Sequence, residues 1–243
     1  MDKGLAYFGG DGVALDYEYA GEWFEKAAVI GMLDELDKED LAWRFEEIGK
    51  WYLEVLQGDP DITGYSDRAD EIFTWAVKFG GAEEAYDIAS RYDEAEFLPD
   101  HEAKAAKWYE AAAEKGNAYA QYELARRYIM GSGVSEDVDK AAEWCEKAAF
   151  QGIDEAQFSM GQMYYFGNLD EFVPSPFLRD YHKAAEWYEK AVAQGHAAAK
   201  YQLGNMYYTG KGVSSDRAKA KALWQEAAAP GVEEAVKNLK EFF

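Results

Sequence analysis

The sequence contains few of the residues that build covalent or metal cross-links. It has one cysteine, Cys145, and three histidines in 243 residues. A single cysteine excludes an intramolecular disulfide and a metal cluster of several thiolates. The chain also lacks any apolar run near the roughly 20 residues that a membrane-spanning helix needs. We therefore expect a soluble, folded protein.

Basic residues are scarce relative to acidic ones. Lys and Arg total 25 against 47 Asp and Glu, which gives a formal net charge of -22. Such a field repels the phosphates of nucleic acid and anionic lipid headgroups, so neither nucleic acid nor a membrane is an expected partner. A basic protein partner is favoured. The alternative, that the acidic residues only keep an aromatic-rich surface in solution, stays open.

Motifs for catalysis are missing. No Ser-x-x-Lys, Gly-x-Ser-x-Gly or His-Glu-x-x-His sequence occurs, which argues against serine and zinc hydrolases. His101, His182 and His196 stand in different units of a repeat of about 36 residues, and none has a second ligand at metal spacing. Surface or inter-helix roles are therefore expected. Cys145 occupies a repeat position that aromatic residues fill elsewhere, and we expect it to be buried rather than reactive. The sequence predicts no enzyme, no metal and no cofactor.

One segment matches part of a calcium-binding loop. Asp59, Asp61, Thr63, Gly64, Tyr65, Asp67 and Asp70 occupy positions one, three, five, six, seven, nine and twelve of the calcium-loop template. Asp70 is shorter than the bidentate Glu that normally closes such a loop, and Ser66 replaces an aliphatic residue. An elongated loop between repeats explains the same residues, and we favour that interpretation.

A repeat of 36 residues, with insertions, organises the chain. Helix-like blocks end at glycines separated by 49, 36, 36, 43 and 36 residues: Gly31, Gly80, Gly116, Gly152, Gly195 and Gly231. Glycine suits the left-handed conformation that often ends a helix. Each block carries a bulky pair eight and seven positions before its glycine and an alanine four positions before it, on one helix face. The residues seven positions before are Phe24, Phe73, Tyr109, Cys145, Tyr188 and Trp224.

A second helix follows each block. It has a small residue with a tyrosine three positions later, at Gly49, Ala89, Ala125, Gly161 and Gly204. Residues three apart share a helix face, so the small residue and its tyrosine are expected to pack against the first helix. The repeating unit is therefore predicted to be a helical hairpin.

Two segments carry this pattern most fully. One is Ala-Ala-Glu-Trp-Cys-Glu-Lys-Ala-Ala at residues 141–149, with Gly152, Ala156 and residues 161–164; the other is residues 184–191, with Gly195 and residues 201–213. Both resemble Sel1-like repeats, which are related to tetratricopeptide arrays. The resemblance implies an all-α fold, a right-handed α/α solenoid of about six helix hairpins, whose members usually serve as adaptors and partner-binding scaffolds.

The array is expected to fill the chain as one domain, residues 1–243. Residues 1–13 form a partial unit, residues 14–100 hold divergent repeats, and residues 101–243 hold well-matched ones. Because the chain opens inside a second helix, an earlier segment with an export signal is conceivable. The cytoplasm is the expected location, with the periplasm as the alternative.

Carboxylates are expected to line the inner groove of the solenoid. First helices face this groove in stacked hairpins, and their outward positions are acidic: Glu22, Glu25, Glu71, Glu110, Glu143, Glu146, Glu186 and Glu189. Their fields add across a concave surface, so a basic helix or loop would fit. The competing interpretation is that Glu22 with Lys26, Glu143 with Lys147, and Glu186 with Lys190 are ion pairs that only support exposed helices.

An apolar, proline-stiffened insertion from Asn168 to Asp180 breaks the repeat spacing. Its aromatic residues, Phe172 and Phe177, either pack on the solenoid or contact a partner. The sequence as a whole predicts a non-enzymatic bacterial adaptor or scaffold that binds a basic protein. The alternative is an immunity protein or inhibitor that neutralises a toxin or effector by direct binding.

Overall fold

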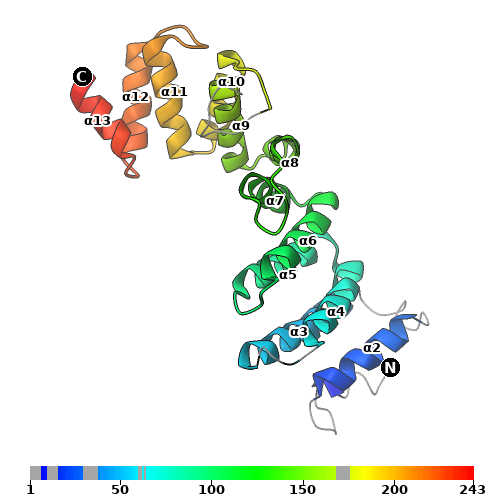
Figure 1. Ribbon diagram of the computed structural model, residues 1–243. Coiled ribbons are helices and arrows are strands. Elements are labelled where there is room, and N and C mark those ends of the chain that lie inside the picture. The colour runs from blue at the N-terminus through cyan, green and yellow to red at the C-terminus, as the bar shows by residue number, and fades with distance from the viewer. Residues whose placement is uncertain (1–6, 10–15, 30–37, 60–61, 63, 168–175) are drawn as a thin grey trace. The chain divides into compact units, whose positions relative to one another are not determined.

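The structure is a computed structural model that describes residues 7–9, 16–29, 38–59, 62, 64–167 and 176–243. Within these ranges the regular elements are helices and no strand is present, as Figure 1 shows. This confirms the all-α prediction. The chain divides into two compact units, residues 1–120 and 121–243.

The first unit contains the helices α2 (Tyr17–Val29), α3 (Lys38–Gly58), α4 (Tyr65–Gly80), α5 (Ala82–Glu94) and α6 (His101–Glu114). The helix α7 (Ala118–Met130) begins at the end of this unit and leads into the second. The second unit continues with α8 (Val138–Phe150), α9 (Asp154–Phe166), α10 (Tyr181–Ala193), α11 (Ala197–Thr209), α12 (Arg217–Ala228) and α13 (Glu233–Phe242). In repeat terms, the even-numbered helices are first helices and the odd-numbered ones are second helices.

Glycine ends most first helices as the sequence predicts. Gly116, Gly152, Gly195 and Gly231 have φ angles between 96° and 103°, in the left-handed region. The prediction is wrong by one residue at Gly80, which is still helical, because Gly81 follows it and takes the left-handed φ of 94° instead. Gly31 lies outside the described residues.

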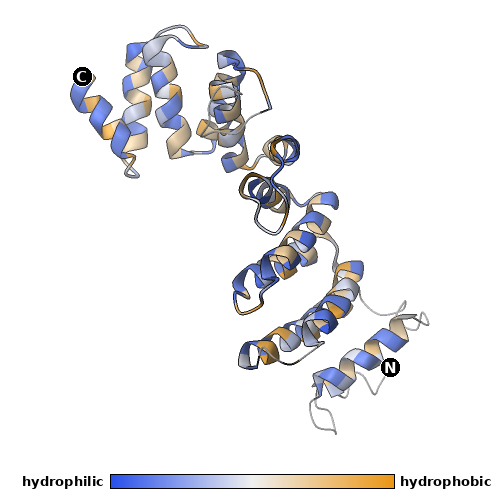
Figure 2. Cartoon of the chain, in the orientation of Figure 1, coloured by the Kyte–Doolittle hydropathy of each residue, from blue (hydrophilic) through white to orange (hydrophobic). Residues whose placement is uncertain are grey.

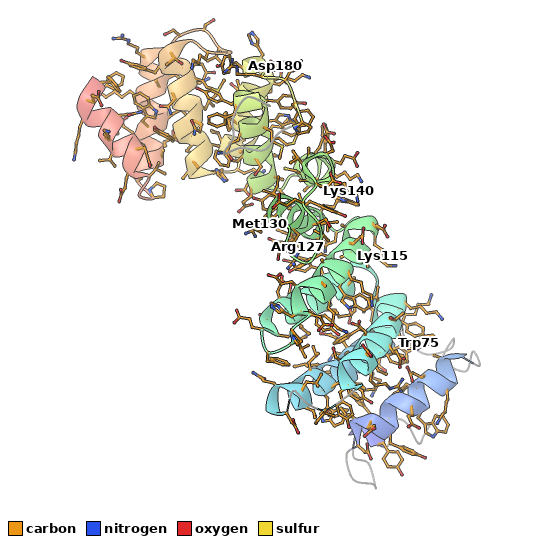
Figure 3. The ribbon with its side chains drawn as sticks, in the orientation of Figure 1. Trp75, Lys115, Arg127, Met130, Lys140 and Asp180 are labelled. Atoms are coloured by element: carbon orange, nitrogen blue, oxygen red, sulfur yellow. The ribbon has the colours of Figure 1, made fainter. Side chains whose placement is uncertain are left out.

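Aspartates start the first helices of the second unit. The side chain of Asp137 accepts a hydrogen bond from the backbone N–H of Lys140 at 3.0 Å, and Asp216 does the same for Lys219 at 2.9 Å. Asp180, labelled in Figure 3, caps α10 in the same way. Each cap satisfies backbone donors that a helix leaves unpaired in its first turn.

The most extensive helix contacts join a second helix to the first helix of the following repeat, as between α3 and α4 and between α9 and α10. A Cβ atom added to Gly49 in α3 would lie 2.4 Å from the Phe73 ring in α4. A Cβ atom on Gly161 in α9 would lie 2.5 Å from Tyr188 in α10. The predicted small residues therefore accept an aromatic ring, and the ring comes from the next repeat rather than from the same hairpin.

The last repeat follows the same rule. A Cβ atom on Gly204 in α11 would lie 2.6 Å from Trp224 in α12, and Trp224 is buried with Ala227 and Ala235. Figure 2 shows that each helix carries both hydrophobic and hydrophilic residues, as expected when one face is buried. Among the described helices, none combines the length and the apolar character needed to cross a membrane.

A matched pair of glycine substitutions in α3 tests the ring contact. Gly49→Ala should destabilise the protein by about 1–3 kcal/mol, because the new methyl group overlaps the Phe73 ring. Gly58→Ala, at the end of the same helix, has nothing within 4 Å of its added Cβ and should be neutral or slightly stabilising. Urea unfolding followed by circular dichroism measures both. Equal stabilities of the two variants would show that the contact is not tight.

Candidate functional site

In the first unit, three of the predicted partner-binding acids are already paired. Glu22 forms an ion pair with Lys26 at 3.0 Å. The Arg68 guanidinium bridges Glu25 on α2 and Glu71 on its own helix, the latter at 2.7 Å. Two cations, Lys26 and Arg68, thus pair with these three carboxylates within the chain, and a role of the three in partner binding stays a prediction. Glu110 in α6 is exposed and has no ion pair within the described residues.

In the second unit, the lysines expected to pair with first-helix glutamates lie on tryptophan rings instead. The Lys147 ammonium stands 3.6 Å from the centroid of Trp144. Lys190 stands 3.8 Å from the centroid of Trp187. Such cation–π contacts are favourable at exposed sites. Glu143 and Glu186, four residues before these lysines, have no ion pair in the described part of the chain, so the ion-pair interpretation is wrong for both.

A hollow of about 430 Å³ lies beside α8 and is lined by Asp139, Ala142, Glu143, Glu146, Pro176 and Phe177. The three carboxylates follow one another at spacings of four and three, which places them along one side of the helix. The structure thus brings Glu143 and Glu146 together with the inserted loop. Asp139 is not among the partner-binding acids predicted from the sequence, although its position four residues before Glu143 could have identified it.

The described end of the insertion packs on its own unit. Phe177 stacks on Tyr164 in α9, with ring centroids 4.6 Å apart and an angle of 14° between the planes. The other face of the loop remains open, since Leu178 is 77% exposed. Phe172 lies outside the described residues. Phe177 therefore forms an aromatic wall of the hollow and remains a candidate for contact with a partner.

Glu189 is used differently from its neighbours. Its carboxylate accepts a hydrogen bond from the Tyr207 hydroxyl at 3.1 Å, and that hydroxyl accepts one from the Lys219 ammonium at 2.5 Å. This hydrogen bond is the main reason that the pKa of Lys219 lies above its ordinary value. Glu189 links α10 to α11 and α12, so its charge is partly compensated.

The contacts of Asp70 argue against a calcium site in the loop at residues 59–70. Its carboxylate accepts hydrogen bonds from the Tyr92 hydroxyl at 2.7 Å, the Lys104 ammonium at 3.0 Å and the Trp108 indole at 3.2 Å. Burial alone would raise the pKa of Asp70, but the hydrogen bonds and the charges of Lys104 and Lys107 hold it below its ordinary value. Asp70 therefore joins α4 to α5 and α6, which favours the inter-repeat loop over a calcium site. Asp61 and Thr63 lie outside the described residues.

His196 and Cys145 both have structural surroundings. His196 accepts a hydrogen bond from the Ala199 backbone at 3.1 Å and stacks on Phe158, and burial lowers its pKa. Burial raises the pKa of Cys145 to about 12, so a thiolate is disfavoured, as the sequence predicted. Across the described ranges, no three His, Cys, Asp or Glu side chains are arranged to hold a metal ion.

A carboxyl pair in the first unit had no sequence signal. Burial, together with the nearby charge of Glu46, raises the pKa of Glu84 to about 7. Glu46 itself is nearly buried and receives a hydrogen bond from the Arg91 guanidinium at 3.0 Å. Nothing in the repeat spacing indicates that α3 and α5 present two carboxyl groups to one arginine.

Comparison with known proteins agrees with the helical repeat. The Sel1 repeat model matches residues 4–28, 97–117, 118–152, 154–196 and 197–231. The chain belongs to the Sel1 repeat family. Sel1 repeats form protein-interaction scaffolds. No curated protein sequence matches this Sel1 repeat chain.

Solved Sel1 repeat structures support the fold. A Sel1 repeat protein from Oxalobacter formigenes is 36% identical over 55% of this chain and 96% of its own length, with a TM-score of 0.50. The protective antigen c5321 of uropathogenic Escherichia coli, which has an SLR fold, is 26% identical over 97% of this chain, with a TM-score of 0.62. This chain spans about half of that protein, 54% of its length. The immunity protein Pa5087 of Pseudomonas aeruginosa is 16% identical over 99% of this chain and 87% of its own length, with a TM-score of 0.42.

The Asp70 contact in this Sel1 repeat protein predicts a defined pH dependence. Asp70→Asn should cost about 3 kcal/mol near pH 7, because it leaves the Lys104 ammonium, whose side chain is 9% exposed, without its closest carboxylate. Since the pKa of Asp70 is lowered on folding, its contribution is present above the unfolded pKa of about 3.9 and is lost as the pH falls through the folded pKa. The wild type and Asp70→Asn should therefore converge in stability in strong acid.

Asp67→Asn is the control for this comparison. Asp67 lies on the same helix, 3.8 Å from Lys104, but its side chain is 91% exposed. The Asp67→Asn substitution should change the free energy of unfolding by less than about 1 kcal/mol. Urea titrations at several pH values measure all three proteins. A loss on Asp67→Asn as large as that on Asp70→Asn would contradict the assignment, and millimolar calcium should leave the melting temperature unchanged.

Proposed function

We propose that this chain is a non-enzymatic scaffold that binds a basic protein partner through first-helix carboxylates of its second unit. The observation that carries the proposal is the hollow beside α8, where Asp139, Glu143 and Glu146 face Phe177. These carboxylates lack an ion pair within the described residues. Three uncompensated negative charges in one depression favour a Lys or Arg side chain.

The position of the lysines strengthens this proposal. Lys147 and Lys190 follow Glu143 and Glu186 by four residues, the spacing of a helical ion pair, yet both lie on tryptophan rings at less than 4 Å. The tryptophan rings thus hold these two lysines away from the carboxylates. A partner cation then gains favourable electrostatic energy without first displacing an internal ion pair.

The aromatic wall adds a second contribution. An Arg or Lys side chain that enters the hollow can place its charge among the carboxylates and its aliphatic stem against Phe177 and Pro176. Phe177 is held by its stack on Tyr164, so little conformational entropy is lost when a partner binds. Outside the hollow, the overall charge of -22 attracts a basic partner during the encounter.

The test is charge reversal in the second unit. Glu143→Lys with Glu186→Lys should keep the fold, because both residues are exposed on helices. The double variant should bind a partner, isolated by affinity pull-down with the wild type from the source cell, at least tenfold more weakly. Most of the loss should appear in the association rate. The association rate of the wild type should fall as salt rises, and that of the double variant should depend less on salt. Surface plasmon resonance at several salt concentrations measures this.

A variant with the same charge change elsewhere is the control. Glu233→Lys with Glu234→Lys reverses two exposed carboxylates in the first turn of α13. It should lower the association rate only through net charge, by less than the variant on α8 and α10. If the two double variants lowered the association rate equally, the result would contradict the proposed site. Whether the partner is a toxin, as the immunity alternative requires, is measured by its activity with and without this chain.

A further inference from the structure

One repeat of the second unit lacks the ring that its neighbours bury. Five of the six residues seven positions before the repeat glycines are aromatic and at most 4% exposed: Phe24, Phe73, Tyr109, Tyr188 and Trp224. The sixth is Cys145 in α8, which is 1% exposed. Cysteine is much smaller than these rings, so α8 cannot fill the space that α10 and α12 fill.

The residue opposite Cys145 does not make up the difference. By the repeat spacing, Ala125 in α7 is the equivalent of Gly161 in α9, and both Ala125 and Cys145 line a cavity of about 220 Å³. Its other walls are Tyr122, Arg126, Ile129, Met130, Ala141, Ser159 and Met163. An engineered apolar cavity of about 150 Å³ is large enough to bind benzene, so this space accepts a phenyl ring. We call it the α7–α8 socket.

The socket offers almost nothing to a polar ligand. The Cys145 thiol donates to the Ala156 carbonyl at 3.5 Å, and the Ser159 hydroxyl donates to the Glu155 carbonyl at 2.8 Å. The Arg126 guanidinium is held by Glu123 at 3.0 Å. These groups therefore already have partners, the Tyr122 hydroxyl lies at hydrogen-bonding distance from Ser159, and the remaining lining is aliphatic or thioether.

The socket is open to solvent at the C-terminal end of α7. Met130, labelled in Figure 3, is the last residue of that helix and is 57% exposed. The Arg126 side chain is 51% exposed. A ring can therefore enter from outside, and the flexible Met130 side chain can close over it. Met is well suited to cover ligands of variable shape.

We propose that the α7–α8 socket receives the Phe or Tyr side chain of a protein partner. The ring would occupy the place that the chain's own ring takes in the other repeats. Protein is the expected source because Sel1 repeats form protein-interaction scaffolds and because buried aromatic anchors dominate such interfaces. The inference rests on the proposed function in that respect, but the socket itself can be tested without the partner.

The probes are toluene and two capped tripeptides, Ala-Phe-Ala and Ala-Ala-Ala. Methionine methyl groups labelled with carbon-13 in the full chain report binding by NMR. Both toluene and the Phe peptide should shift the Met130 and Met163 signals, with a dissociation constant on the order of millimolar for one buried ring. The Met206 signal, from a buried position within α11, and the Ala peptide are the controls.

Filling the socket from within should abolish the response. Ala125→Gly with Cys145→Tyr recreates the Gly161 and Tyr188 pair; it should weaken both ring probes at least tenfold and melt a few degrees above Ala125→Gly. If that variant does not fold, Cys145→Leu fills part of the same space and should weaken the probes in the same direction. Cys145→Ser keeps the size of the side chain, so the ring probes should still shift the Met130 and Met163 signals as they do in the wild type.

Three results would overturn the proposal. The first is wild-type Met130 and Met163 signals that move with neither ring. The second is a filled variant that responds like the wild type. The third is a response to toluene without one to the Phe peptide, which would assign the socket to a free aromatic compound instead of a protein side chain. None of these results bears on the acidic hollow, whose test is charge and salt dependence.

Discussion

The contact on which the rest of the structure depends is an aromatic ring seated against a small residue of the preceding helix. Gly49 and Gly161 have no room for a Cβ atom because Phe73 and Tyr188 occupy it. This contact crosses from one repeat to the next, so each hairpin is held mainly by its neighbour. A repeat of this kind cannot bury its hydrophobic face alone, which is why such units occur in arrays.

That constraint leaves the outward positions of the first helices free to carry charge. The ring and the alanine stripe fix one face of each first helix, and the opposite face carries the charged residues. In the first unit this face is used for internal ion pairs, with Arg68 bridging Glu25 and Glu71. In the second unit the lysines cover tryptophan rings, and carboxylates of the same face remain uncompensated.

The helical repeat could be predicted from sequence because backbone periodicity and glycine punctuation are local properties. The choice between competing side-chain contacts could not. Lys147 is four residues from Glu143 and three from Trp144, and both partners are within reach of its side chain. Which one it contacts depends on packing that the spacing does not encode. Asp70 shows the same limit, since its donors come from helices more than 20 residues away.

The helix α8 carries both proposed contacts. Glu143 and Glu146 border the hollow near Phe177, while Cys145 borders the socket beside α7. The two contacts would act on different steps of binding, because exposed charges chiefly raise the association rate and a buried ring chiefly slows dissociation. A partner that uses both would need a basic segment and an aromatic side chain presented to two sides of one helix. This requirement is more selective than charge alone, since an acidic surface attracts any basic protein but the socket retains only those that carry a ring at the right place.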